Sequence, residues 1–182
     1  MDADPLARQM LDRLLVRRDL QLRGLIEDIG PPALASRSVE ALAVTVLEAV
    51  VPAPLVPDMT TLDGPERTSG GWIWAVALDG GHDLAACLPS RWLVLPRDDP
   101  SGTDDRLYLV FYYIADGATI DDTWVLFQRD WRDALAWIAY ANAVVAQATR
   151  RWRAVASARI ARRASGAGAG ADADIGGKPL DR

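Results

Sequence analysis

The residues that decide the fold are 72–78, which read WIWAVAL. Tryptophan, isoleucine and valine are enriched in β-strands, and a run of this length is typical of one strand. Successive side chains of a strand point to opposite faces of a sheet, so this run places apolar groups on both faces. It therefore predicts a central strand. The Asp79-Gly80-Gly81-His82 step after it predicts a tight turn, because glycine adopts a positive φ at little cost.

Other short runs rich in Val, Ile, Tyr, Trp and Leu follow this strand before Gln128. Turn residues separate them at the spacing expected of an antiparallel meander, and Asp116-Gly117 supplies one such turn. The sequence therefore predicts a four- to five-stranded antiparallel sheet. The further strands are expected at residues 83–88, 92–95, 107–115 and 123–128.

Helical periodicity flanks the predicted sheet on both sides. Apolar residues at alternating spacings of three and four predict helices over residues 5–29 and 38–50, with Ser36 or Ser38 available to cap the second. After Arg129 a seven-residue apolar repeat predicts one long helix from Asp130 to near Ala164. The repeat consists of Ala134, Ile138, Ala141, Val145, Ala148, Trp152 and Val155.

The expected fold class is therefore α+β. Two N-terminal helices precede an antiparallel meander sheet, and the long C-terminal helix packs on that sheet. Residues 1–164 are expected to form a single domain. Residues 165–182 begin with an Ala-Gly alternation that buries too little apolar surface to offset chain entropy, so they are expected to form a disordered tail.

Charged side chains are unevenly distributed along the chain. The 182 residues carry 20 basic and 25 acidic side chains. Residues 1–149 hold 12 of the basic and 22 of the acidic ones, whereas residues 150–163 hold six arginines and no acid. Because an acidic body repels phosphate backbones, nucleic acid is not expected as a partner except through the arginine segment.

Several classes of site and location are excluded by simple features of the sequence. One cysteine and one histidine are too few for a disulfide framework or a multi-histidine metal centre, and no phosphate-binding glycine motif occurs, so no metal or cofactor is expected. Met1 to Asp4 lack the positive charge of a signal peptide, which favours the cytoplasm. The longest uncharged run, residues 134–149, is too short and too polar for a membrane span.

Cys87 and His82 are the candidate catalytic residues. A cysteine nucleophile needs a base and a group that orients it, and His82 with Asp79 or Asp83 supplies those residue types. However, if residues 83–88 form a strand, His82 and Cys87 point to opposite faces. We therefore expect a solvated turn histidine and a buried cysteine, and keep a small enzyme with a Cys87/His82 site as an alternative.

Carboxylates cluster in residues 98–105. Asp121-Asp122 would extend this acidic edge of the predicted sheet only if the strand order brings the two segments together. Loop carboxylates are suitable calcium ligands, but the regular ligand spacing of an EF-hand is missing. An ordinary solvated loop is the favoured interpretation.

The arginine segment leaves three interpretations open. On a helix, residues 150–163 would pair with acidic groups of this chain or of a partner protein, or form a solvated face. The third interpretation is binding to an anionic membrane or to nucleic acid, with Trp152 at the interface.

The aromatic residues indicate a binding surface. Most of the seven tryptophans are expected in the core, but a sheet covered on one side only leaves aromatic residues of its other face exposed. The consecutive Phe111, Tyr112 and Tyr113 must point to both sides of a strand. The predicted partner-binding residues are Trp72, Trp74, Tyr112, Trp124, Arg150, Arg151, Trp152 and Arg153.

Together these features favour a non-enzymatic protein-interaction module. We expect it to act as an adaptor, a dedicated chaperone or a toxin-neutralising partner, as a homodimer or as a subunit of an assembly. Its self-association surface would be the long helix repeat or the N-terminal apolar stripe. The alternatives are the Cys87/His82 enzyme and a peripheral membrane or nucleic-acid binder acting through the arginine segment.

Overall fold

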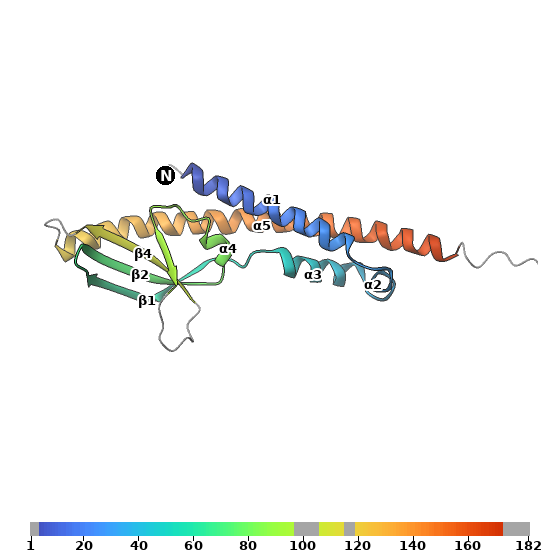
Figure 1. Ribbon diagram of the computed structural model, residues 1–182, viewed down its shortest axis with the longest axis horizontal. Coiled ribbons are helices and arrows are strands. Elements are labelled where there is room, and N and C mark those ends of the chain that lie inside the picture. Colours follow the sequence, from blue (N-terminus) through green and yellow to red (C-terminus); the bar gives the residue numbers. More distant parts are fainter. Residues whose placement is uncertain (1–3, 97–105, 115–118, 173–182) are drawn as a thin grey trace, which may run out of the picture. The chain divides into compact units, whose positions relative to one another are not determined.

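The computed structural model describes residues 4–96, 106–114 and 119–172, with side chains described as far as Gly166 (Figure 1). It confirms the α+β class, with helices before and after an antiparallel sheet. The chain divides into two compact units. The first comprises Met1–Leu14 and Pro52–Val144, and the second comprises Leu15–Val51 and Val145–Arg182. Helices α1 (Pro5–Glu27) and α5 (Ile120–Asp172) contribute to both, and each unit is described by itself.

The first unit contains the sheet, whose four strands are all antiparallel to their neighbours. Their order is β1-β2-β4-β3, so β4 lies between β2 and β3 and the order departs from a consecutive meander at that point. The WIWAVAL run lies in β2, which is central as predicted. The strands are β1 (Val56–Arg67), β2 (Gly71–Asp79), β3 (Leu93–Pro96) and β4 (Leu107–Ile114).

The edge strand β1 is not predicted from the sequence, because Pro57, Gly64 and Pro65 are typical of a loop. It nevertheless pairs with β2, with register shifts between Asp58 and Asp63 and between Asp63 and Glu66. Proline lacks a backbone N–H and is tolerated in a sheet mainly at an edge or a bulge, which is where β1 places it.

Residues 83–88 do not form the predicted strand. They follow Gly80 and Gly81, whose φ values of 67° and 61° confirm the predicted glycine turn. This turn leads into the short helix α4 (His82–Ala85) rather than back into the sheet. The apolar residues Leu84 and Ala85 are buried by one helical turn instead of by strand pairing.

Residues 123–128 are also not a strand, because α5 begins at Ile120 and includes them. The cause is a capping box formed by Thr119 and Asp122. The Asp122 carboxylate accepts hydrogen bonds from the Thr119 backbone N–H at 3.0 Å and from its hydroxyl at 2.7 Å. These two bonds, the backbone one first, lower the pKa of Asp122. At its other end α5 continues to Asp172, past the predicted start of the tail; residues 173–182 lie outside the described residues.

Aromatic side chains pack the first part of α5 against the sheet. The Phe127 ring is stacked on Trp74, with 5.0 Å between centroids, and meets Phe111 edge-on at 5.2 Å. Trp131, one turn further along α5, contacts both phenylalanine rings at 6.2 Å. Because Phe127 is almost fully buried, this cluster is the centre of the core in the first unit.

Asn142 interrupts the apolar sequence of α5 for a structural reason. Its side-chain oxygen accepts a hydrogen bond from the Leu55 N–H at 3.0 Å, and its Nδ2 donates to the Leu55 carbonyl at 2.9 Å. Leu55 lies in a proline-rich segment outside any helix or strand, so the amide of Asn142 satisfies backbone groups that have no ladder partner.

The second unit is a helical cluster. It contains α1 from Leu15, α2 (Pro31–Ser36), α3 (Val39–Val50) and α5 from Val145. The Ser38 side chain accepts a hydrogen bond from the Ala41 N–H at 3.1 Å and caps α3, as one of the two predicted options. The core side chains of this unit are Leu22, Ile26, Leu34, Leu42, Ala43, Val46, Leu47, Val50, Ala148, Trp152, Ala156 and Ile160.

The predicted repeat of α5 holds from Ala134 to Trp152 and then changes its spacing. Val155 is 37% exposed, and the buried positions after Trp152 are Ala156 and Ile160. Their spacing is four residues at each step, whereas a heptad alternates three and four. Such a change moves the buried stripe around the helix and leaves Val155 outside the core.

Arg163 of α5 forms hydrogen bonds with the C-terminal end of α1 within the second unit. Its Nη1 donates to the carbonyls of Ile26 and Glu27 at 3.0 and 2.8 Å, and its Nη2 donates to that of Ile29 at 3.0 Å. The last carbonyls of a helix have no partner inside the helix, and they carry the negative end of its dipole. One arginine of the cationic segment therefore pairs with the chain itself.

We expect Arg163→Ala to lower the free energy of unfolding by about 1–3 kcal/mol, because it leaves these carbonyls without their charged donor. The matched control is Arg162→Ala, since Arg162 is exposed and its Nε donates to the Ala158 carbonyl of its own helix. The control should change stability by less than about 0.5 kcal/mol. Urea unfolding followed by circular dichroism measures both, and equal effects would contradict the assigned role.

Candidate interaction surface

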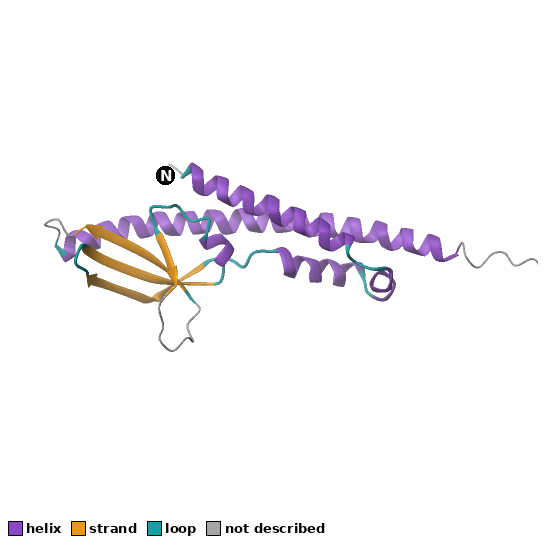
Figure 2. Cartoon of the chain, in the orientation of Figure 1, coloured by secondary structure: helices purple, strands orange, loops and turns teal. Residues whose placement is uncertain are grey.

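The register of the sheet assigns its side chains to two different faces. Directly paired residues of antiparallel strands point to the same face. Trp74 pairs with Phe111, and both rings contact the Phe127 ring of α5. Ala75 pairs with Val110 and therefore points to the opposite face. One face of the sheet is thus covered by α5, whose first part runs along the strands in Figure 2.

The opposite face exposes large apolar side chains. Ile114 is 73% exposed, Leu93 51%, Leu95 48% and Tyr112 45%. At one end of this face Tyr108 is buried, so the exposure is concentrated toward Ile114 and along β3. Among the described residues no helix packs on these side chains. We call this surface the open face, consisting of Ile73, Ala75, Leu93, Leu95, Val110, Tyr112 and Ile114.

Tyr112 is held in position by two glycines. A Cβ atom at Gly70 would collide with the Tyr112 hydroxyl, and one at Gly71 would lie 3.0 Å from Tyr112 Cζ and overlap the Tyr113 carbonyl oxygen. The ring therefore lies directly against the turn that precedes β2. An aromatic ring that covers a glycine across the strands stabilises the sheet locally. On the open face, Tyr112 is thus packed on one side against this turn.

Acidic side chains of β1 border the open face. Asp58 pairs with Ala77, Asp63 with Ala75, and Glu66 with Ile73. In a regular strand, residues separated by five or three positions point to opposite faces. The two register shifts in β1 each reverse this alternation, so all three carboxylates lie on the side of the open face. We call these three residues the acidic row.

The members of the acidic row differ in their surroundings. Asp58 accepts hydrogen bonds from the Thr60 hydroxyl at 2.6 Å and the Thr60 N–H at 3.0 Å, which lower its pKa, and Arg106 approaches it at 3.9 Å. Asp63 and Glu66 are more exposed than Asp58. The most exposed part of the row is therefore its Asp63 and Glu66 end, beside Ala75 and Ile73.

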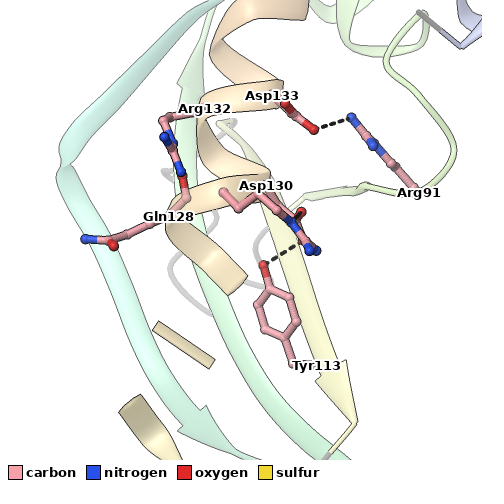
Figure 3. Close-up of polar contacts among 7 residues, drawn as sticks. Arg91, Tyr113, Gln128, Asp130, Arg132 and Asp133 are labelled. Atoms are coloured by element: carbon pink, nitrogen blue, oxygen red, sulfur yellow. Dashed lines mark hydrogen bonds and ion pairs between the residues drawn. The ribbon is translucent and has the colours of Figure 1, made fainter. Parts of the chain in front are cut away.

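Polar contacts on the other face help to fix α5 there (Figure 3). The Tyr113 hydroxyl donates to Asp130 at 3.1 Å, and Arg91 pairs with Asp133 at 3.2 Å. Partial burial raises the pKa of Tyr113, and the neighbouring Asp130 carboxylate raises it further. Both contacts join α5 to segments of the first unit, so they stabilise the layer behind the open face.

The predicted partner-binding aromatic residues do not form one surface. Tyr112 lies on the open face, 45% exposed. Trp74 is buried on the α5 side, where Trp124 lies 5.0 Å from it between ring centroids. Trp72 is on the same side and is half-buried, with the Arg67 guanidinium 5.6 Å from its ring. The exposed Leu93, Leu95 and Ile114 were not predicted, although a strict two-residue alternation through Tyr112 does indicate Ile114.

The remaining predicted binding residues belong to the second unit. Trp152 is buried in its core, whereas Arg150, Arg151 and Arg153 are exposed. Arg151 lines a groove of about 540 Å³ between α1 and α5. The groove also contains Leu15, Val16, Asp19, Leu20, Arg23, Trp152 and Val155.

The residues of the catalytic alternative do not come together in a site. His82 is exposed at the start of α4, whereas Cys87 is 3% exposed and its thiol donates to the Asp83 carbonyl at 3.4 Å. Within the described ranges no group of three His, Cys, Asp or Glu side chains is arranged to hold a metal ion. The carboxylates of residues 98–105 and the Asp116-Gly117 turn lie outside the described residues.

No helix in the described part of the chain is both long and apolar enough to cross a bilayer. Comparisons with protein-family models, with curated proteins and with solved structures found no match to this chain.

We expect Tyr113→Phe to alter the pH dependence of stability. The raised pKa means that the folded state favours the neutral hydroxyl, so its contribution is complete below the ordinary tyrosine pKa of 10.0 and is lost as the pH rises above it. Between about pH 8 and about pH 10.5 the wild type should therefore lose roughly 0.5 kcal/mol more than the variant. Urea unfolding at the two pH values measures this; identical losses would contradict it.

We also expect the Cys87 thiol to be unreactive in the folded protein. A buried thiol reacts with a maleimide only when the surrounding structure opens, so labelling should be more than about 100-fold slower than in guanidinium chloride. Mass spectrometry of timed samples measures the rate, and Cys87→Ser provides the unlabelled control. Rapid labelling of the folded chain would instead favour the Cys87/His82 enzyme.

Proposed function

We propose that this chain is a non-enzymatic protein-interaction module whose open face binds a segment of another protein. It would serve as an adaptor, a dedicated chaperone or a toxin-neutralising partner. The observation that carries the proposal is the exposure of Leu93, Leu95, Tyr112 and Ile114 on one uncovered face of the sheet. Contiguous apolar side chains of this size are uncommon on a surface without a partner, and they are the usual centre of a protein interface.

The rigidity of this surface supports the proposal. The strands that carry these side chains are held from behind by the aromatic cluster of Phe127 and Trp74. Tyr112 is further fixed by its contact with Gly70 and Gly71. A preformed surface loses little conformational entropy on binding, so more of its apolar contact contributes to affinity.

The proposal includes a cytoplasmic location and a homodimer or assembly subunit as the working form. Support for assembly comes from the second unit, where Val16 and Leu20 are 62% and 63% exposed beside the α1–α5 groove. A surface that presents both protruding side chains and a groove is suited to contact with a second copy of itself.

The arginine segment gives less support to a membrane or nucleic-acid function. Trp152, the residue expected at a membrane interface, is 3% exposed, and Arg163 is bonded to the end of α1. Both residues therefore have structural roles in the second unit.

We expect a photo-crosslinking amino acid in place of Tyr112 to give one discrete adduct with another protein in the cells that produce this chain. The control places the same crosslinker at Val125, which is 64% exposed on α5 and outside the open face. Adding Leu93→Ser and Ile114→Ser should abolish the Tyr112 adduct, while each of these two exposed substitutions changes stability by less than about 0.5 kcal/mol. Gel analysis and mass spectrometry identify the adducts. No adduct from Tyr112, or the same adducts from Val125, would contradict the proposal.

A further inference from the structure

The acidic row has a regular spacing along the strand direction. Its members pair with Ala77, Ala75 and Ile73, which are two residues apart on β2. Two residues of a strand span roughly 7 Å, so the three carboxylates follow one another at about that interval. Basic residues four positions apart on an α-helix are separated by about 6 Å along its axis. A helix lying along the strands can therefore direct a lysine or arginine toward successive carboxylates.

The dimensions of the open face also suit a helix. Neighbouring strands lie about 4.8 Å apart, and a helix with its side chains is about 10 Å wide. A helix centred over β2 and β4 would cover Ala75, Val110 and Tyr112, and one of its flanks would lie over β1. The small side chain of Ala75 allows close approach at the centre.

Addition of an extended strand at an edge of the sheet fits less well. On β1, Pro57 and Pro65 lack backbone donors and the register shifts interrupt the ladder. On the other edge, β3 has only four residues and ends at Pro96. Neither edge offers the long unpaired ladder that strand addition requires.

The charge of the first unit favours a basic partner at longer range. Its sequence segments, Met1–Leu14 and Pro52–Val144, carry 17 acidic and 8 basic side chains. Such an excess accelerates encounter with a cationic partner and disfavours an anionic one.

We propose that the occupant of the open face is a basic amphipathic helix of a partner protein. Its apolar side would cover Tyr112, Val110 and Ala75, and its lysines or arginines would lie along Asp58, Asp63 and Glu66. This inference rests on the proposed function, because it assumes that the open face is a binding surface and specifies what binds there.

The test uses three synthetic 18-residue peptides labelled for fluorescence anisotropy. The first is an amphipathic helix of leucine and lysine, the second carries glutamate in place of every lysine, and the third has the composition of the first in an order without an apolar side. The full-length chain should bind the first peptide with 1:1 stoichiometry and more tightly than the other two.

Variants separate the charge effect from the apolar one. Asp63→Asn with Glu66→Gln should weaken binding of the leucine–lysine helix about 5- to 20-fold, the effect of two partly exposed charge pairs. The matched control, Asp12→Asn with Asp121→Asn, removes two exposed carboxylates elsewhere and should leave affinity within about twofold. Leu93→Ser with Ile114→Ser should weaken it by at least about tenfold.

The alternative outcomes distinguish this inference from the function on which it rests. If the glutamate helix binds as tightly as the lysine helix, or both carboxylate variants weaken binding equally, the basic-helix inference is wrong. The open face remains a binding surface in that case if Leu93→Ser with Ile114→Ser still abolishes the Tyr112 adduct. If no peptide binds and Tyr112 gives no adduct, both proposals fail.

Discussion

The stacking of Phe127 on Trp74 is the contact on which the first unit depends. It fixes α5 on one face of the sheet, and Phe111 and Trp131 extend the same cluster along β4 and α5. A single helix covers only one face, yet the WIWAVAL strand is apolar on both. The apolar side chains on the second face are therefore not buried by α5. This asymmetry explains why a well-packed sheet exposes leucine, tyrosine and isoleucine side chains, and it is the physical basis of the proposed binding surface.

In the second unit, apolar side chains are buried between helices and not on a sheet. Leu22, Ile26, Val50 and Ile160 from three helices are almost completely buried together. The change of spacing after Trp152 brings Ala156 and Ile160 into that core and places Val155 outside it. Arg163 then donates hydrogen bonds to the carbonyls of Ile26, Glu27 and Ile29 at the end of α1. The arginine segment is thus partly a structural element, and its composition does not by itself indicate an anionic ligand.

The parts of the fold that follow from local periodicity could be predicted from the sequence. The doubly apolar β2, the aromatic run of β4 and the repeat from Ala134 to Trp152 each have a pattern that few alternatives share. Secondary structure was predicted wrongly where two features of the sequence favour different structures. Residues 123–128 are rich in strand-forming side chains, but the capping box of Thr119 and Asp122 starts a helix before them. That motif was visible in the sequence. The edge strand β1 was not, because its prolines are typical of a loop and only its pairing with β2 defines it.

The sequence predicts that one face of the sheet exposes aromatic residues, but it does not identify all the residues of that face. The alternation of Phe111, Tyr112 and Tyr113 correctly places Tyr112 on the side opposite its two neighbours. It does not reveal which face α5 covers, so the sequence alone does not separate Trp72 and Trp74 from Tyr112. The position of the acidic row could not be predicted from the sequence, because in a regular strand Asp58 and Asp63 point to opposite faces. The register shifts of β1 place them together, and such shifts depend on how one strand fits its neighbour. Such shifts are common in edge strands, where they also interrupt the ladder that another chain could extend.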